Sequence, residues 1–118
     1  MKVQSIESHE QAPVTMEGAS GAQMRMLIGP GEKAPNFHMR HFEVEVGGFT
    51  PHHQHDYEHE IVILKGEGVA KSEQGERPFS AGDIVYVPAN EMHNFSNTGD
   101  APLEFICLIP APQDCSIE

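Results

Sequence analysis

The stretch Phe42-Glu43-Val44-Glu45-Val46 alternates apolar and acidic side chains and is followed at once by Gly47-Gly48. Successive side chains of a β-strand point to opposite faces, so this alternation predicts a strand with one buried and one wet face. The glycine pair is a turn signal, which predicts that the strand ends there. A half-buried strand bounded by a turn is the unit from which all-β domains are built.

The same unit recurs along the chain. Its 11 Gly and 9 Pro are spaced so that few stretches as long as a helix lack one, and in a helix interior Pro costs about 3 kcal/mol and Gly about 1 kcal/mol. Between these breakers lie short runs rich in Val, Ile, Phe and Met: 23–28, 37–46, 59–64, 69–72, 83–87, 92–96 and 103–109. Many short strands at this spacing predict an all-β sandwich, jelly roll or barrel.

The 118 residues suit one domain, and we find no internal repeat. We expect a core over about 22–110, an N-terminal arm over 1–12 that adds to a sheet edge, and a loose tail over 111–118. Two runs, 61–64 and 105–109, are apolar on both alternating faces. Either they are inner strands of a sandwich, or a second subunit covers their outer face. We favour the second reading, a homodimer.

The charge balance excludes some partners. Seven Lys and Arg against 18 Asp and Glu give a net charge of −11, which argues against nucleic acid and against an anionic membrane surface. The longest apolar run, 105–109, is far too short to span a bilayer. The first residues carry no apolar leader, and the chain has only two Cys, so we expect a reduced cytoplasmic protein.

Four of the eight His lie close together, at His52, His53, His55 and His59. In an extended chain, residues two apart point to the same face, so His53 and His55 share one. His59 lies four residues after His55, so it points to the same face as well unless 56–58 forms a turn. Neutral imidazole nitrogen binds Zn²⁺, Mn²⁺, Fe²⁺ and Ni²⁺. The spacing therefore predicts a partial metal shell, and the alternative is a solvated His-rich loop.

A second segment, 82–97, carries one more His after a Pro-Ala-Asn turn. The two segments together resemble the two sequence motifs of the cupin family over residues 36–110. The matching positions are Gly47, His53, His55, Glu60 and Gly66 in the first motif, and Gly82, Pro88, Asn90, His93 and Asn97 in the second. The second motif departs from the family only at Asn90, where the family has Gly. Asn is the residue that best replaces Gly at positive φ.

The resemblance implies a double-stranded β-helix, the jelly-roll barrel of cupins, with a metal held by His53, His55 and His93. The fourth family ligand is acidic and lies three or four residues after the second His. These positions are His59 and Glu60, and strand parity favours His59 inward, with Glu60 as the alternative. The chain thus resembles small cupins with four His around manganese. We expect Mn²⁺ or Fe²⁺ in the cell, and Ni²⁺, Zn²⁺ or Cu²⁺ can replace them on purification.

Four neutral ligands leave the metal its full charge, which favours an anionic fifth ligand. We therefore expect a metal-dependent oxidoreductase, dioxygenase or isomerase acting on a small anionic molecule. The alternatives are a non-catalytic module that binds a sugar or an organic acid, and a structural metal site. The sequence identifies no catalytic residue.

Other residues have two readings each. Cys107 is either a small buried hydrophobe or an oxidisable neighbour of the metal. Arg40 either pairs with a substrate carboxylate or balances the acidic surface, and Tyr57 and Phe95 either line the mouth or pack in the core. The remaining His, which are His9, His38, His41 and His52, match no motif.

Overall fold

The computed structural model describes residues 1–111, so most of the tail expected over 111–118 lies outside the described residues. Over residues 1–111, two short 3-10 helices, η1 (Ile6–Ser8) and η2 (Pro30–Glu32), accompany nine strands. The strands are β1 (Ala12–Pro13), β2 (Ser20–Ile28), β3 (Phe37–Phe49), β4 (His59–Lys65), β5 (Glu67–Ser72), β6 (Gly75–Ser80), β7 (Ile84–Val87), β8 (His93–Asn97) and β9 (Leu103–Pro110). The all-β prediction is confirmed. Within residues 1–111, no helix is long and apolar enough to cross a membrane.

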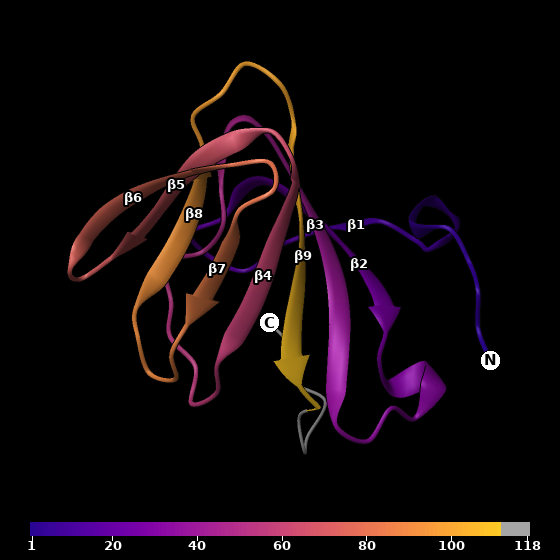
Figure 1. The fold of residues 1–118 in the computed structure, drawn as a ribbon. Helices are drawn as coiled ribbons and strands as arrows, with labels where there is room; N and C mark the ends of the chain where they lie inside the picture. Colours follow the sequence, from indigo (N-terminus) through magenta and orange to yellow (C-terminus); the bar gives the residue numbers. More distant parts are fainter. Residues whose placement is uncertain (112–118) are drawn as a thin grey trace.

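The strands form one curled antiparallel sheet in the order β6-β5-β8-β3-β9-β4-β7, while β2 pairs with β3 and β1 with β2. Figure 1 shows the sheet curling so that the β5–β6 hairpin lies to one side and β2 to the other. Strands β6 and β7 stand at the two ends of this order, and among the described strands they do not pair with each other. The barrel therefore has a seam between β6 and β7.

The core fills the inside of this barrel. Strands β4 and β9 bury every second residue, as period-two alternation requires. Apart from His59 at the start of β4, the inward set is apolar and includes Ile61, Ile63, Phe105 and Ile109. The outward residues of β4 are only partly covered, with Val62 36% and Leu64 39% exposed. The two runs that are apolar on both faces thus have one buried face and one that is half-exposed.

The predicted turn at Gly47-Gly48 is wrong, because β3 continues through it to Phe49. Gly47 has φ +81°, and the register with β2 shifts there, which is the geometry of a β-bulge. A Cβ on Gly48 would lie 2.6 Å from the Ser20 carbonyl oxygen. The glycine pair therefore bends a long strand and lets β2 approach it.

The sequence did not predict strand β6. Strand β6 contains Pro78 beside charged residues, and only Phe79 of its six residues is buried. Its sequence predicts a turn around Gly75 rather than a strand. The strand forms because β6 is an edge that, among the described strands, pairs only with β5, and Pro is tolerated on an edge.

The second motif folds as a turn and a strand. Asn90 has φ +67°, which confirms that this position needs the left-handed conformation. The Asn97 side-chain nitrogen donates to the carbonyl oxygens of Val44 and Ala101, each at 2.9 Å. Its side-chain oxygen accepts from the Gly99 backbone nitrogen at 2.9 Å. Asn97 thereby ties the end of β8 to β3 and to the loop that leads into β9.

Candidate metal centre

Four imidazole rings form a closed cycle inside the barrel. The ring centres are 4.4 Å apart for His53–His55, 5.3 Å for His55–His59, 4.9 Å for His59–His93 and 5.2 Å for His93–His53. Rings that bind one ion through nitrogens at about 2.0–2.1 Å would have centres roughly 4.6–5.3 Å apart. Over residues 1–111, no group of three His, Cys, Asp or Glu side chains yet meets ion-site geometry. Three of the four spacings lie within this range and the fourth is slightly below it, so the rings are gathered about as closely as rings around one ion, without the nitrogens meeting ion-site geometry.

Two of the rings are fixed by strands. His59 begins β4 and His93 begins β8, and their exposed fractions are 3% and 6%. The next residue of β4, Glu60, lies opposite Tyr86 and Leu108 and is exposed on the outside of the barrel. Strand β4 thus directs His59, and not Glu60, towards the other rings.

The other two rings come from the irregular segment 50–58 between β3 and β4. This segment bends at 56–57, so strand alternation is not the reason that His53 and His55 converge. Backbone hydrogen bonds link His53 and His93 in both directions, at 3.1 and 2.9 Å. The Asn90 backbone nitrogen donates to the His55 carbonyl oxygen at 2.6 Å. The turn of the second motif therefore holds the loop of the first.

The partners of the Nδ1 atoms indicate which nitrogens face the cluster. The Nδ1–H of His93 donates to the Glu91 carbonyl oxygen at 2.8 Å, and Nδ1 of His53 lies 3.3 Å from the Met16 thioether sulfur. Both partners are acceptors, so Nδ1 carries the hydrogen and Nε2 keeps its lone pair. Nδ1 of His59 lies 3.6 Å from the thiol sulfur of Cys107.

Within the cluster, two ring nitrogens are buried with no hydrogen-bond partner, Nε2 of His55 and Nε2 of His59; outside it, His9, His38 and His41 each have one. A buried polar atom left unpaired costs free energy, so it marks a position where another group is expected. Metal-binding His typically engage their second nitrogen with a carbonyl or similar group, which orients the ring. This donor set therefore suits a borderline divalent metal ion.

The rings are held in the neutral form that metal binding requires. Burial, with help from the neighbouring His, lowers the pKa of His53 to about 4 and that of His59 to about 3. Burial also lowers the pKa of His55 and His93. All four rings are consequently free of protons that would compete with a metal at neutral pH.

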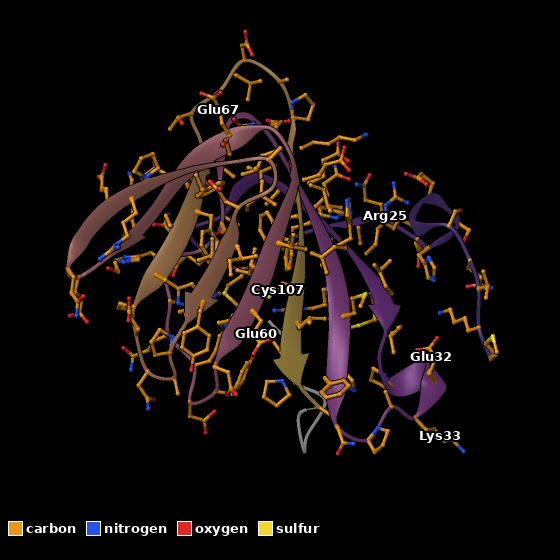
Figure 2. The ribbon with its side chains drawn as sticks, in the orientation of Figure 1. Arg25, Glu32, Lys33, Glu60, Glu67 and Cys107 are labelled. Atoms are coloured by element: carbon orange, nitrogen blue, oxygen red, sulfur yellow. The ribbon has the colours of Figure 1, made fainter. Side chains whose placement is uncertain are left out.

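A small cavity of about 40 Å³ lies among the rings. Arg40, which is 4% exposed, lines it, so the reading of Arg40 as a surface residue is wrong. The Nη2 atom of Arg40 lies 3.3 Å from the Cys107 sulfur, and its guanidinium lies 5.1 Å from the Phe42 ring centre. Figure 2 shows Cys107 in the middle of the barrel. Burial raises the pKa of the Cys107 thiol, which keeps it protonated.

Tyr57 stacks on His55, with ring centres 4.8 Å apart and planes 9° from parallel. Phe95 packs in the core and also lines the small cavity. The His without a motif lie outside the cluster. His41 contacts Glu104 at 3.0 Å, and His52 is exposed.

The sequence did not point to Met16 or to the Glu91 carbonyl group. Met16 reaches His53 because the segment between β1 and β2 folds against the loop of the first motif, and no spacing rule links residues 37 positions apart. The Glu91 contact is local, two residues before His93. Such a contact becomes visible only once the turn geometry is known.

A barrel of antiparallel strands with an imidazole cluster inside defines a small β-barrel protein with a polar interior. Residues 40–109 match the family model described as a cupin domain. The chain belongs to the cupin family.

Named relatives show how widely the fold is used. The chain is 33% identical over 76 residues to 1-methylthio-D-xylulose 5-phosphate methylsulfurylase of Rhodospirillum rubrum, covering 64% of this chain and 49% of that protein. It is 41% identical over 58 residues to an oxalate-binding protein of Thermotoga maritima, covering 48% of each. The chain thus spans about half the length of these two relatives. The structure of the polyketide cyclase RemF from Streptomyces resistomycificus superposes with a TM-score of 0.89 at 29% identity, covering 95% of this chain and 80% of that one.

Proposed function

We propose that this chain is a metal-dependent cupin that acts on a small anionic molecule. The observation that supports it best is the cycle of four imidazole rings, at 4.4–5.3 Å spacing, with buried unpaired nitrogens on His55 and His59. The ligands in this proposal are His53, His55, His59 and His93.

A divalent metal in this site would supply a Lewis acid with its full 2+ charge, because all four ligands are neutral. The residues of the chain do the rest. The Glu91 carbonyl, Met16 and Cys107 hold the rings by their Nδ1 atoms. Arg40 adds a second positive charge to the wall of the cavity, and burial keeps water scarce around it.

The reaction class we propose is that of an oxidoreductase, dioxygenase or isomerase. Relatives with a matching segment are named as an isomerase, a methylsulfurylase and, among structures, a polyketide cyclase. Among the described residues, no Asp or Glu lines the small cavity. A proton-transferring carboxylate is therefore not at hand there, which favours chemistry driven by the metal charge.

For the resident metal we propose Mn²⁺ or Fe²⁺. A site built of nitrogen donors follows the Irving–Williams order in a test tube, so Ni²⁺, Zn²⁺ or Cu²⁺ can displace them once the protein leaves the cell. Selection then depends on metal supply in the compartment. We place the protein in the cytoplasm, where the buried thiol of Cys107 stays reduced.

The test is a metal titration of chelator-treated protein by calorimetry, and with Mn²⁺ by electron paramagnetic resonance. We expect one ion per chain. His59→Ala should weaken binding by more than the roughly 10–100-fold that is typical of outer-shell changes. His52→Ala is the matched control, because His52 lies in the same segment but is exposed. A wild-type chain that binds no divalent ion, or a His52→Ala effect as large as that of His59→Ala, would refute the proposal.

The second candidate is a non-catalytic binding module. It is favoured by the similarity to an oxalate-binding protein, the relative with the highest identity among those named above. The two functions differ in turnover, so the loaded protein should be incubated with small acids and sugar phosphates and the products followed by NMR. Tight binding of oxalate without conversion of any compound would favour the module.

We also propose a homodimer formed through the outer face of β4 and β9. Leu64 and Ile106 line an apolar hollow on this face together with Leu27, Ile28 and Met39. A second copy would cover apolar side chains that water now reaches. Light scattering should give twice the chain mass, and Leu64→Glu should give the monomer mass. A monomeric wild type at micromolar concentration would contradict this part.

A further inference from the structure

A second and larger hollow opens beside the His cluster, between β5, β6 and β7. Its volume is about 590 Å³, within the range of small-molecule sites. His93 and Phe95 line both this hollow and the small cavity among the rings. The larger hollow therefore reaches the edge of the candidate metal centre.

The hollow exists because the inner face of β5 carries only small residues. Gly68, Ala70 and Ser72 alternate along that face. A Cβ on Gly68 would lie 2.2 Å from the Ser96 carbonyl oxygen, so only Gly fits there. The seam between β6 and β7 leaves the space open to solvent. Small residues and an unpaired seam together create room where other parts of the barrel are filled.

Arg77 stands at the rim of this hollow. It lies two residues before the buried Phe79, so both share the inner face of β6. The strand register places Arg77 opposite Ala70, and Ala70 opposite Phe95. Two strand spacings make about 10 Å, so Arg77 stands about that far from the strand that carries His93.

Three other charged residues line this hollow, Lys71, Asp83 and Glu91, and the first two have side-chain partners. Lys71 lies 3.9 Å from Glu76. The Asp83 carboxylate accepts a hydrogen bond from the Ser80 backbone N–H at 2.9 Å, which stabilises the turn between β6 and β7. One part of the wall is apolar, formed by Phe79, Val85, Val87 and Phe95.

We propose that this hollow is the substrate compartment of the metal centre. It takes an elongated small molecule with an aromatic or apolar body, an anionic group at Arg77 and an oxygen donor directed to His93, on the strand about 10 Å away. The cavity among the rings, at about 40 Å³, has room for little more than a water molecule or two. A substrate of more than a few atoms must therefore lie in the larger hollow. This inference rests on the proposed function, because it gives that site its substrate class.

The test uses 6-hydroxy-2-naphthoate, which carries a carboxylate and a hydroxyl at opposite ends of an aromatic body. The chain has no Trp, so the fluorescence anisotropy of the probe can be followed without protein background. The probe is titrated with metal-loaded and with metal-free protein. We expect binding to both forms, tighter when metal is present.

Two variants and a control separate the parts of the hollow. Arg77→Gln should weaken naphthoate binding about fivefold, the upper range for an exposed charge pair, and leave binding of uncharged 2-naphthol unchanged. Ala70→Met should remove binding of both probes by filling the hollow. Val69→Met, on the outer face of the same strand, should change neither. Metal affinity should be unaltered in all three variants.

The outcomes against the inference are distinct. It is overturned if the wild type does not bind the naphthoate, if Arg77→Gln binds it as well as the wild type, or if glucose 6-phosphate binds more tightly than the naphthoate. Should no metal bind at all, the proposed function fails, while the metal-free titrations still decide whether the hollow takes this class of molecule. Should Ala70→Met fail to fold, Arg77→Gln and the two naphthalene probes carry the test.

Discussion

Two halves of the His cluster are built in different ways. His59 and His93 belong to strands β4 and β8, whose ladders fix them in the barrel wall, and both are buried. His53 and His55 belong to an irregular segment held by a few backbone hydrogen bonds and are half-buried. The comparison shows that a site can combine a rigid pair of ligands with an adjustable pair. The adjustable pair can turn towards an ion that the rigid pair already faces.

The largest effect should separate the two halves directly. His93→Ala removes a ring, leaves the Glu91 carbonyl without its donor, and empties part of the barrel core. His55→Ala removes a ring from a loop that can rearrange. We expect both to weaken metal binding by more than about 100-fold, and only His93→Ala to lower the midpoint of thermal unfolding of the metal-free protein. Equal unfolding midpoints for the two variants would remove the distinction between the halves.

The pH dependence sharpens the comparison. The pKa of His53 is lowered to about 4 and that of His59 to about 3, and in both cases burial is the largest cause. An unfolded His takes up a proton near pH 6.5, so below that pH the unfolded chain binds more protons than the fold. The contribution of these rings to stability is thus fully present above about pH 6.5 and is lost as pH falls towards 4 and then 3.

In the metal-free protein, NMR titration of the imidazole Cε1–H signals should show this order. His53 should accept its proton at a higher pH than His59. Ring assignments come from the single His→Ala variants. A His59 signal that titrates near 6.5 would show that water reaches this ring, which would contradict the burial of the His that lie on strands.

The next effect concerns the sulfur atoms that contact the Nδ1 atoms of the rings. Cys107 lies behind His59, and Met16 lies behind His53. If the His59 Nδ1–H donates to the Cys107 sulfur, the Nε2 lone pair faces the cluster. We expect Cys107→Ala to lower metal affinity about 10–100-fold, with Cys107→Ser recovering part of it, because Ser keeps an acceptor. Met16→Leu should have a smaller effect, because the loop can shift.

The tautomer of His59 gives a readout that a packing defect would not change. In the metal-free protein, the ¹⁵N shifts of His59 should report a hydrogen on Nδ1 in the wild type and in Cys107→Ser. They should report a mixture of tautomers in Cys107→Ala. A wild-type ring with its hydrogen on Nε2 would mean that the thiol donates to the ring and that this account of Cys107 is wrong.

The sequence predicted the fold well because period-two patterns encode burial directly. Val44, Ile61 and Phe105 are buried as their alternation requires. It failed at β6, where an edge strand needs no apolar pattern, and at Gly47-Gly48, where a bulge uses the same residues as a turn. These features depend on what the partner strand does, which local sequence does not record.

The sequence named four His whose rings the structure brings together, but the reason for expecting this holds only in part. Parity places His59 inward along β4, but the segment with His53 and His55 is not a strand. Arg40 lies inside the barrel, which contradicts the surface alternative of its two readings. A charged residue inside a small core cannot be read from sequence, because its burial depends on Cys107 and Phe42 from across the sheet and along its own strand.

The smallest expected effect is at Glu60, the acidic alternative to His59. Strand β4 turns its side chain to the outside of the barrel, where it is exposed (Figure 2). Reaching the rings would require a one-residue slip of β4, which would also turn Ile61 and Ile63 out of the core. Glu60→Gln should therefore leave metal affinity within about twofold of the wild type, against the large loss for His59→Ala. A loss on Glu60→Gln as large as that for His59→Ala would assign the fourth ligand to the carboxylate and require that slip.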